Sequence, residues 1–415
     1  MYKIRSIEID GFWHRHDVKA TFNDEVNVVI GRNGTGKTTF MNILQAVLAV
    51  DIEGLIETQF DTVSIVLANK AGQRRTVRAL KIEDGGQPYA VVEYRISTRK
   101  FLLPLFSEAM GRLYARRRFL EEAAEIRKTL RKIVSLASLS VYRIRNDSDP
   151  DTRERVQSKR FASPVDFRLG ELMSQFTQYQ LELSQQAQEV SIDLQKRVLS
   201  SLLFEKDSKE GAFDAKFNAV EEKKNLTLAY TQLGVTGPAI TKRIIEHVAS
   251  IESTYAELDK TGMTKNIGPL EAKRRTDKVV KLSLEAANKT KDINSQITLF
   301  LDELASFIRD KRFTLISGEL RIEADGDLPI EKLSSGEKQL LILLVEALLQ
   351  RQQPYVFLAD EPELSLHIAW QKKIVPAVKR MNPNAQVIVA THSPEVAGRY
   401  TDSLIDMEDM IHGAA

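Results

Sequence analysis

The sequence contains no cysteine among its 415 residues. This absence excludes disulfides, thiol catalysis and thiolate-bound metal sites, and it agrees with a reducing cytoplasmic compartment. The sequence also lacks a long apolar run, because the longest stretch, residues 340–349, has about ten residues and contains Glu346, whereas a membrane span needs roughly 20. We therefore expect a soluble, cytoplasmic protein with no membrane segment.

Neither sign of charge dominates, because 59 Lys and Arg residues nearly balance 57 Asp and Glu residues. A net charge of +2 gives no basis for general affinity for nucleic acid, so any contact with DNA must be local. The first residues, MYKIRSIEIDGF, alternate polar and apolar side chains like a strand and lack the apolar core of a secretory signal. We expect no export.

The N-terminal part of the chain, residues 1–145, has the pattern of mixed strands and helices. A chain of 415 residues exceeds what one hydrophobic core usually serves, which indicates two lobes or one domain with an insertion. A helix is predicted from about Lys37, and three alternating segments after it predict an antiparallel meander. The predicted strands are residues 2–10 and 25–31, and the meander comprises residues 62–70, 74–82 and 89–97.

The middle of the chain, residues 164–312, is predicted to be a helical insertion. Apolar residues at three- and four-residue spacings over 169–204 predict a long helix, and Gly-Pro pairs at 237–238 and 268–269 divide the remainder of the insertion. The longest helix would have about 40 residues and a length on the order of 60 Å. Residues 313–415 return to a strand and helix pattern, so the two ends should build one domain around the insertion.

A glycine-rich segment reads GRNGTGKTT and lies between the apolar strand VNVVI and an apolar helix. The pattern G-x-x-x-x-G-K-[ST] in this setting predicts a phosphate-binding loop, and a turn without a ligand is the less favoured alternative. Glycines let backbone N–H groups surround phosphates, Lys37 supplies a cation and Thr38 offers a hydroxyl to Mg²⁺. The predicted phosphate-binding residues are Gly31, Arg32, Asn33, Gly34, Thr35, Gly36, Lys37, Thr38 and Thr39.

Two adjacent carboxylates follow the apolar run YVFLA near the C-terminus. Asp360 at the end of this predicted strand is the candidate Mg²⁺ ligand of a bound nucleotide. Glu361 is then placed to accept a proton from, or to orient, the water that attacks the terminal phosphate. Two acids at the end of a strand more often only face solvent. The other motifs in the sequence favour the nucleotide site over this alternative.

The segment LSSGEKQ precedes a strongly apolar helix. Alone, it predicts a helix start with Ser335 as capping residue and Glu337 in the first turn. The same helix start presents backbone donors and a positive dipole end to a phosphate, so Ser335, Gly336 and Glu337 are candidate nucleotide contacts. A further predicted strand ends at THS, where His392 could reach a terminal phosphate or serve only a structural role.

In this order the motifs resemble the ATP-binding cassette (ABC) superfamily: Walker A (GRNGTGKT), signature (LSSGEKQ), Walker B (VFLADEP), D-loop (SLH) and switch histidine (THS). The resemblance covers roughly residues 1–145 and 313–415. It implies an α/β P-loop ATPase head, with a mixed core sheet and an antiparallel β-subdomain, interrupted by a helical, partly coiled-coil insertion. The family's active form is a head-to-tail homo-oligomer in which each ATP lies between two subunits.

The resemblance assigns a role to each motif. The Walker A loop would bind the phosphates of ATP on one subunit, and Ser335 and Gly336 would contact the γ-phosphate from the other. Asp360 would hold Mg²⁺, and Glu361 and His392 would be catalytic, Glu361 by polarising the water and His392 by sensing the γ-phosphate. Residues 365–367 would lie at the dimer interface.

The family's Q-loop glutamine has no clear match in the sequence. Gln59 lies too close to the Walker A helix to fill this role. Arg143 and Arg145 follow a predicted strand and could be nucleotide contacts or surface charges, of which the surface role is favoured.

The wording of the motifs LSSGEKQLLILLVEALL, DEPELSLH and NPNAQVIVATHS resembles one soluble branch of the superfamily. That branch contains the OLD nucleases, RecF and the ATPase subunits of anti-phage systems, such as AriA of PARIS and PtuA of Septu and retron systems. Because 23 residues follow His392, we expect no Toprim nuclease domain in this chain. The resemblance implies a sensor and scaffold that controls a separate Toprim-type effector nuclease and responds to a phage protein. A RecF-like DNA-repair clamp and an inactive nucleotide-binding module are the alternatives.

Overall fold

The computed structural model describes residues 1–82, 90–105, 113–140, 164–201, 217–261, 266–324, 326–364 and 366–413. The chain forms two compact units, residues 1–176 with 299–415, and residues 177–298. The units divide inside helices α5 (Pro164–Ser201) and α8 (Gly268–Phe307), whereas the predicted insertion begins with α5 at Pro164 and ends at Arg312, after α8.

The first unit contains a five-stranded sheet in the order β14-β3-β13-β12-β8, in which each pair of neighbours runs parallel. The Walker B strand β12 and its neighbour β13 are buried throughout, as continuous apolar runs in parallel sheets usually are. Because parallel strands end at one edge, the segments after β3, β12 and β13 are brought together there. The bounds are β3 Val26–Ile30, β8 Leu136–Ser140, β12 Val356–Asp360, β13 Gln386–Ala390 and β14 Leu404–Asp406.

A second sheet of seven antiparallel strands has the order β15-β2-β1-β4-β5-β6-β7. The predicted meander is confirmed, because β4, β5 and β6 pair antiparallel in succession. The predicted strand at residues 2–10 lies in this sheet and not beside β3, and its alternating burial is that of a one-sided sheet. The bounds are β1 Lys3–Phe12, β2 His16–Thr21, β4 Thr62–Ala68, β5 Arg74–Ile82, β6 Val91–Ile96, β7 Arg99–Pro104 and β15 Ile411–Gly413.

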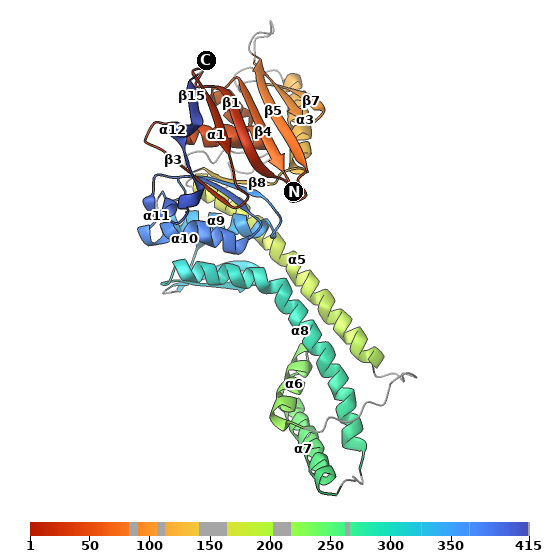
Figure 1. The fold of residues 1–415 in the computed structure, drawn as a ribbon. Coiled ribbons are helices and arrows are strands. Elements are labelled where there is room, and N and C mark those ends of the chain that lie inside the picture. Colours follow the sequence, from red (N-terminus) through yellow and green to blue (C-terminus); the bar gives the residue numbers. More distant parts are fainter. Residues whose placement is uncertain are drawn as a thin grey trace. The chain divides into compact units, whose positions relative to one another are not determined.

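Helix α1 (Lys37–Ala49) is apolar on nearly all sides and shares one core cluster with residues of both large sheets. Figure 1 draws the ribbon of α1 behind strands of the seven-stranded sheet. A helix buried all round needs partners on every side, which the two sheets supply. Besides its parts of α5 and α8, this unit includes α2 Ile52–Glu57, α3 Leu113–Arg131, α9 Ser335–Leu349, α10 Ile368–Met381, α11 Pro394–Ala397, α12 Met407–Met410 and a three-stranded sheet of β9 Arg312–Ile316, β10 Glu319–Ala324 and β11 Gly326–Leu328.

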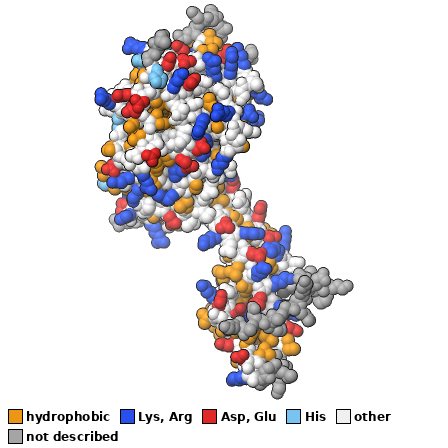
Figure 2. Space-filling model, viewed as in Figure 1, with side chains coloured by type: hydrophobic (Ala, Val, Ile, Leu, Met, Phe, Trp, Pro, Cys, Tyr) orange, Lys and Arg blue, Asp and Glu red, His pale blue; other side chains and the backbone are white. Residues whose placement is uncertain are grey.

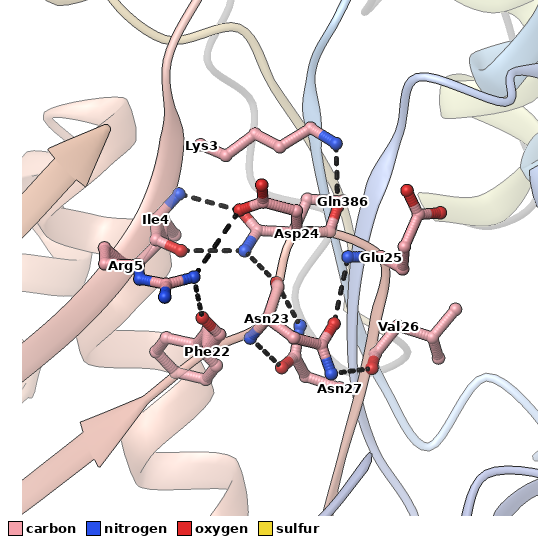
Figure 3. A network of polar contacts seen from close by, with 10 residues as sticks. All are labelled: Lys3, Ile4, Arg5, Phe22, Asn23, Asp24, Glu25, Val26, Asn27 and Gln386. Carbon is pink, nitrogen blue, oxygen red and sulfur yellow. Dashed lines mark hydrogen bonds and ion pairs between the residues drawn. The ribbon is translucent and has the colours of Figure 1, made fainter. Parts of the chain in front are cut away.

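The buried side chain of Gln386, the first residue of β13, links the two large sheets (Figure 3). Its amide oxygen accepts a hydrogen bond from the backbone N–H of Ile4 at 2.7 Å, and its NH₂ group donates to the carbonyls of Ile4 and Asn23, each at 2.7 Å. Asn27 of β3 joins the network by accepting from the N–H of Asn23 at 2.8 Å. The side chain of Gln386 thus pairs with β1 as a strand backbone would, close to the start of β3.

The second unit, residues 177–298, contains parts of α5 and α8 together with α6 (Ala219–Gln232) and α7 (Pro238–Thr261). The predicted long helix and both Gly-Pro breaks are confirmed, since α7 begins at Pro238 and α8 at Gly268. Helix α8 has 40 residues, as expected for the longest helix. No helix within the described ranges combines the length and apolarity that crossing a membrane requires.

Candidate nucleotide-binding site

The glycine-rich loop connects β3 directly to the first turn of α1. Gly36 has φ 97° and precedes the helix as its N-cap residue. A Cβ atom at this position would lie 2.8 Å from the Trp13 ring, so both the backbone angle and the space require glycine. The loop therefore presents the unpaired N–H groups of the α1 N-terminus, as a phosphate site needs.

The ammonium group of Lys37 is buried inside the loop, and its side chain is 4% exposed. Its Nζ atom donates to the carbonyls of Gly31 at 2.8 Å and Arg32 at 3.0 Å. Burial lowers the pKa of Lys37, although the nearby carboxylates of Glu361 and Asp360 oppose this change. The loop thus holds the Lys37 ammonium group in place among its own backbone carbonyls.

A cavity of about 730 Å³ opens between this loop and the ends of β12 and β13. This volume is within the range that small-molecule and cofactor sites usually have. Residues of the N-terminal and C-terminal parts of the chain therefore form one site. Its lining includes Asn33, Gly34, Gly36, Lys37, Thr38, Thr39, Glu361, Glu363 and His392.

Asp360 lies at the end of β12 with its side chain 8% exposed. The hydroxyl of Thr38 donates to its carboxylate, while the oxygen Oδ1 has no hydrogen-bond partner in the described part of the chain. Burial raises the pKa of Asp360 to about 6, and the neighbouring carboxylates of Glu361 and Glu363 add to this effect. A buried carboxylate oxygen without a partner beside a hydroxyl fits a hard cation such as Mg²⁺.

Among the described residues, no group of three or more His, Asp or Glu side chains is arranged to hold a metal ion. Mg²⁺ in nucleotide sites usually takes one or two protein oxygens and completes its shell with phosphates and water. Asp360 and Thr38 are in keeping with such a set.

The two candidate catalytic side chains face each other at the edge of the cavity. The Oε1 atom of Glu361 lies 3.5 Å from Nε2 of His392. Glu361 has φ 46°, a left-handed conformation that is uncommon for this residue type, and its N–H donates to Ala390 at 2.8 Å. Strained backbone of this kind is often found at functional sites, where the surrounding structure fixes it.

Six residues of the cavity lining were not predicted, and three of them, Glu363, Gln371 and Trp13, make contacts that bear on the site. Glu363 accepts hydrogen bonds from the segment that carries His392, and Gln371 accepts one from the hydroxyl of Ser393 at 2.7 Å. Trp13 lines the cavity beside Gly36 and packs against Phe12 with ring centroids 4.7 Å apart. For Glu363 a sequence signal existed, since it is the third acid in DEPE directly after a buried strand.

The signature segment forms the N-terminus of α9, but its cap is Ser334 and the prediction of Ser335 as cap is wrong. The hydroxyl of Ser334 accepts from the N–H of Glu337 at 3.3 Å, and the Glu337 carboxylate accepts from the N–H of Ser334 at 2.8 Å. This reciprocal pair is a capping box, whose S-x-x-E spacing Ser334 satisfies and Ser335 does not.

The three predicted signature contacts lie away from the cavity of their own chain. Ser335 is exposed, and the described lining of the cavity includes neither it nor Gly336 nor Glu337. Glu337 also accepts a hydrogen bond from Lys311 at 2.6 Å, so its carboxylate is engaged within α9 and its surroundings. Contacts of these residues with nucleotide stay a prediction.

The remaining predicted residues lie elsewhere or outside the described residues. His367 is the N-cap of α10, and its Nδ1 atom accepts from the N–H of Ala369 at 3.2 Å. Gln59 is exposed and is not part of the described cavity lining. Ser365, Arg143 and Arg145 lie outside the described residues.

Two protein families match parts of this chain. Residues 135–398 match the family described as "AAA domain, putative AbiEii toxin, Type IV TA system". Residues 2–102 match the family described as "AAA ATPase domain".

Two named relatives match shorter stretches of the chain. "Retron Ec83 probable ATPase" of Escherichia coli is 36% identical over 80 residues, which cover 17% of this chain and 15% of the relative. "Septu protein PtuA" of Bacillus thuringiensis is 33% identical over 87 residues, which cover 18% of this chain and 22% of the relative. The matched regions thus span less than a quarter of either relative's length.

Two solved Smc head domains are also similar. That of Pyrococcus furiosus, with an extended coiled coil and bound to the C-terminal domain of ScpA, has a TM-score of 0.48 and 16% identity over 100% of this chain and 97% of that one. That of Pyrococcus yayanosii, with a coiled coil and joint, has a TM-score of 0.44 and 16% identity over 100% and 98%. At these TM-scores the likeness is loose.

Proposed function

Because the chain belongs to the AAA-domain family that its residues 135–398 match, we propose that it binds and hydrolyses ATP with Mg²⁺ as an ABC-type ATPase. The observation that carries the proposal is the meeting of the glycine-rich loop and the ends of β12 and β13 in one cavity. Lys37, Thr38, Glu361 and His392 all line that cavity. The hydroxyl of Thr38 is hydrogen-bonded to the carboxylate of Asp360.

The arrangement supports a simple hydrolytic step. The loop and Lys37 would hold the phosphates, and Asp360 with Thr38 would hold Mg²⁺, which neutralises charge on the phosphate oxygens. Glu361 would take a proton from the attacking water as its oxygen bonds to the γ-phosphorus and the bond from that phosphorus to the bridging oxygen breaks. His392, 3.5 Å from Glu361, would contact the same phosphate.

We further propose that two copies assemble head to tail around ATP. The N-terminus of α9 has its exposed Ser335 away from the cavity of its own chain. A helix N-terminus offers backbone donors and a positive dipole end, so the γ-phosphate held by a second copy is a suitable ligand.

The finer proposal is a cytoplasmic sensor and scaffold of anti-phage defence that controls a separate effector, a Toprim-type nuclease, and responds to a phage protein. The retron ATPase and Septu PtuA matches support a defence role for this ATPase. Within that group we propose a PARIS-type AriA subunit, on the wording of the signature and Walker B segments.

ATP hydrolysis is tested with Glu361→Gln and Lys37→Met. Glu361→Gln should bind ATP but slow phosphate release by roughly 100-fold, because the proton acceptor is lost. Lys37→Met should weaken ATP binding by about 10- to 100-fold, because charge-assisted hydrogen bonds are lost. Undiminished turnover in Glu361→Gln would contradict the mechanism.

The head-to-tail arrangement is tested by mixing two inactive variants. Ser335→Arg blocks the signature and keeps the loop, whereas Lys37→Met blocks the loop and keeps the signature. If the sites are shared, the mixture should regain up to about a quarter of wild-type turnover, because half of the dimers have one intact site. No recovery would contradict the arrangement.

The scaffold role is tested by co-expressing the chain with the products of its neighbouring genes. Wild type and Glu361→Gln should each retain one of these products during purification, and the native mass with ATP should show a stable joint assembly. Recovery of the chain alone from both preparations would contradict the scaffold role.

A second candidate function, an ATP-dependent DNA clamp, is favoured by a row of basic side chains on the seven-stranded sheet. Arg78, Arg95 and Lys100 lie directly opposite one another on β5, β6 and β7. Like charges across strands are unfavourable unless paired, and Glu93 pairs with Arg95 at 2.6 Å and Lys100 at 2.8 Å. Figure 2 shows Lys and Arg side chains gathered over the region where Figure 1 draws β5.

A DNA clamp would bind duplex DNA only with ATP, and binding would weaken steeply with salt. Arg78→Glu should abolish this binding and leave ATP hydrolysis intact. DNA binding that needs neither ATP nor Arg78 would count against this candidate.

A further inference from the structure

Glu363 is a buried carboxylate that lies between the Walker B strand and the segment after β13. Its side chain is 8% exposed and lines the cavity. Its Oε1 atom accepts hydrogen bonds from the hydroxyl of Thr391 and from the N–H groups of His392 and Ser393, each of the latter at 3.2 Å. One oxygen thus binds three consecutive residues.

These donors belong to the residues that place the imidazole of His392. A chain that leaves a buried strand has N–H groups without ladder partners, and hydrogen bonds to an ionised carboxylate are among the strongest that can satisfy them. Ser393 is held on its other side by Gln371, at 2.7 Å between the two oxygens. The backbone on either side of the imidazole is therefore fixed.

Because this backbone is fixed, the Cα–Cβ bond of His392, from which the imidazole extends, is fixed as well. His392 lies 3.5 Å from Glu361, whose own backbone is held in a left-handed conformation. A shift of about 1 Å at such a pair is enough to lower turnover by up to roughly 100-fold.

We infer that Glu363 is a positioning residue: it fixes residues 391–393 and thereby aims His392 at Glu361 and the terminal phosphate. The inference rests on the proposed ATPase function and assigns a role to a residue between the Walker B and D-loop segments, for which the sequence analysis gave none. The second carboxylate oxygen of Glu363, Oε2, is buried and has no hydrogen-bond partner among the described residues. Holding residues 391–393 needs one acceptor oxygen, so a glutamine at position 363 should suffice for a positioning role.

The test compares Glu363→Ala and Glu363→Gln in wild-type and His392→Ala backgrounds. Glu363→Ala should lower kcat by roughly 10- to 100-fold and change the Kd for ATP by less than about threefold, because the loop and Lys37 bind the phosphates independently. Glu363→Gln should restore kcat to within about threefold of wild type, since its amide oxygen still accepts from the segment. In the His392→Ala background, Glu363→Ala should lower kcat by less than about twofold.

The inference is overturned if Glu363→Ala lowers kcat equally in both backgrounds, or if Glu363→Gln is as slow as Glu363→Ala. The second result would assign the carboxylate a direct role in the cavity. A weakening of ATP binding by the same factor as kcat would also overturn it, because the variant would then have damaged the whole site.

Hydrogen exchange without nucleotide separates this inference from the proposed function. The amides of His392 and Ser393 should exchange at least about tenfold faster in Glu363→Ala, while amides of α1 are unchanged. A wild-type chain that releases no phosphate overturns the ATPase function, and the exchange rates still decide whether Glu363 fixes the segment. The matched control is Glu395→Ala, whose carboxylate pairs with Lys372 at 2.8 Å and is not part of the described cavity lining. It should change neither kcat nor the exchange of these amides.

Discussion

The hydroxyl of Thr38 in the first turn of α1 donates a hydrogen bond to the carboxylate of Asp360 at the end of β12. This bond joins the Walker A and Walker B segments directly, although more than 300 residues separate them in the sequence. The carboxylate is buried here at a cost, because burial raises the pKa of Asp360 to about 6. The buried position of Asp360 therefore lowers the stability of the free protein at neutral pH, as we would expect of a residue that is kept for ligand binding.

Asp360→Asn should stabilise the nucleotide-free protein in a pH-dependent way. The ordinary pKa of 3.8 applies to the unfolded chain, so the native state binds more protons between about pH 4 and 6 and wild-type stability falls as pH rises through this window. Asp360→Asn avoids this loss. Its free energy of unfolding should therefore equal that of wild type at pH 4 and exceed it by about 1–3 kcal/mol at pH 7. Urea unfolding in EDTA measures it.

In the same experiment Mg²⁺ with ATP should stabilise wild type and not Asp360→Asn. The exposed Asp402→Asn is the control and should change stability by less than about 0.5 kcal/mol at any pH. An Asp360→Asn advantage that does not change with pH would contradict the prediction.

Trp13 should report nucleotide binding by its fluorescence. The sequence has two tryptophans, and Trp13 lines the cavity while Trp370 packs edge-on against Phe307 with ring centroids 6.0 Å apart. ATP should change the emission of wild type and of Trp370→Phe, but not of Trp13→Phe. Trp13→Ala should also raise the Kd for ATP by roughly tenfold, because the aromatic ring that lines one side of the cavity is removed. A full ATP signal in Trp13→Phe would show that the nucleotide does not reach this ring.

The residues that converge on the cavity were predictable where the chain itself fixes their place. Gly36, Lys37 and His392 come after buried strands of the parallel sheet and Asp360 ends one, and the ends of such strands meet at one edge. The N-cap residue of α9 could also have been predicted from the sequence, because the S-x-x-E spacing selects Ser334 and not Ser335.

Other features depend on contacts that no local pattern reveals. The turn after β1 brings Trp13 against Gly36, and Gln386 pairs with β1 across almost the whole length of the chain. A buried glutamine or tryptophan has the same neighbours in sequence whether or not such a partner exists. The boundaries of the compact units fall inside continuous helices, where the sequence has no break to mark them.

Gln386→Ala should lower the free energy of unfolding by about 2–4 kcal/mol, because it leaves the backbone groups of Ile4 buried without partners. Urea unfolding measures the loss, and the exposed Gln353→Ala should lose less than about 0.5 kcal/mol. Equal losses in the two variants would mean that the network in Figure 3 contributes little to stability.

Replacing Arg168 should destabilise the protein, because the buried carboxylate of Glu346 in α9 would lose its positively charged partner. Arg168 in α5 donates to Oε1 of Glu346 at 2.7 and 3.2 Å, and Glu346 is 3% exposed. Burial raises the pKa of Glu346, and the arginine opposes this change. Arg168→Met should therefore lower the free energy of unfolding by about 3–5 kcal/mol at pH 8, since an unpaired carboxylate stays buried.

The loss in Arg168→Met should shrink towards pH 5. Without the arginine the pKa of Glu346 rises further above its ordinary value, so the native state binds the extra proton and the penalty disappears as pH falls. The double variant Arg168→Met, Glu346→Gln should recover most of the stability at pH 8, because no charge is left to bury. The control is Arg197→Met, whose pair with Glu285 at 3.1 Å is about 40% exposed on both sides and should contribute less than about 1 kcal/mol. A loss in Arg168→Met that is the same at pH 5 and pH 8 would mean that Glu346 does not carry the penalty.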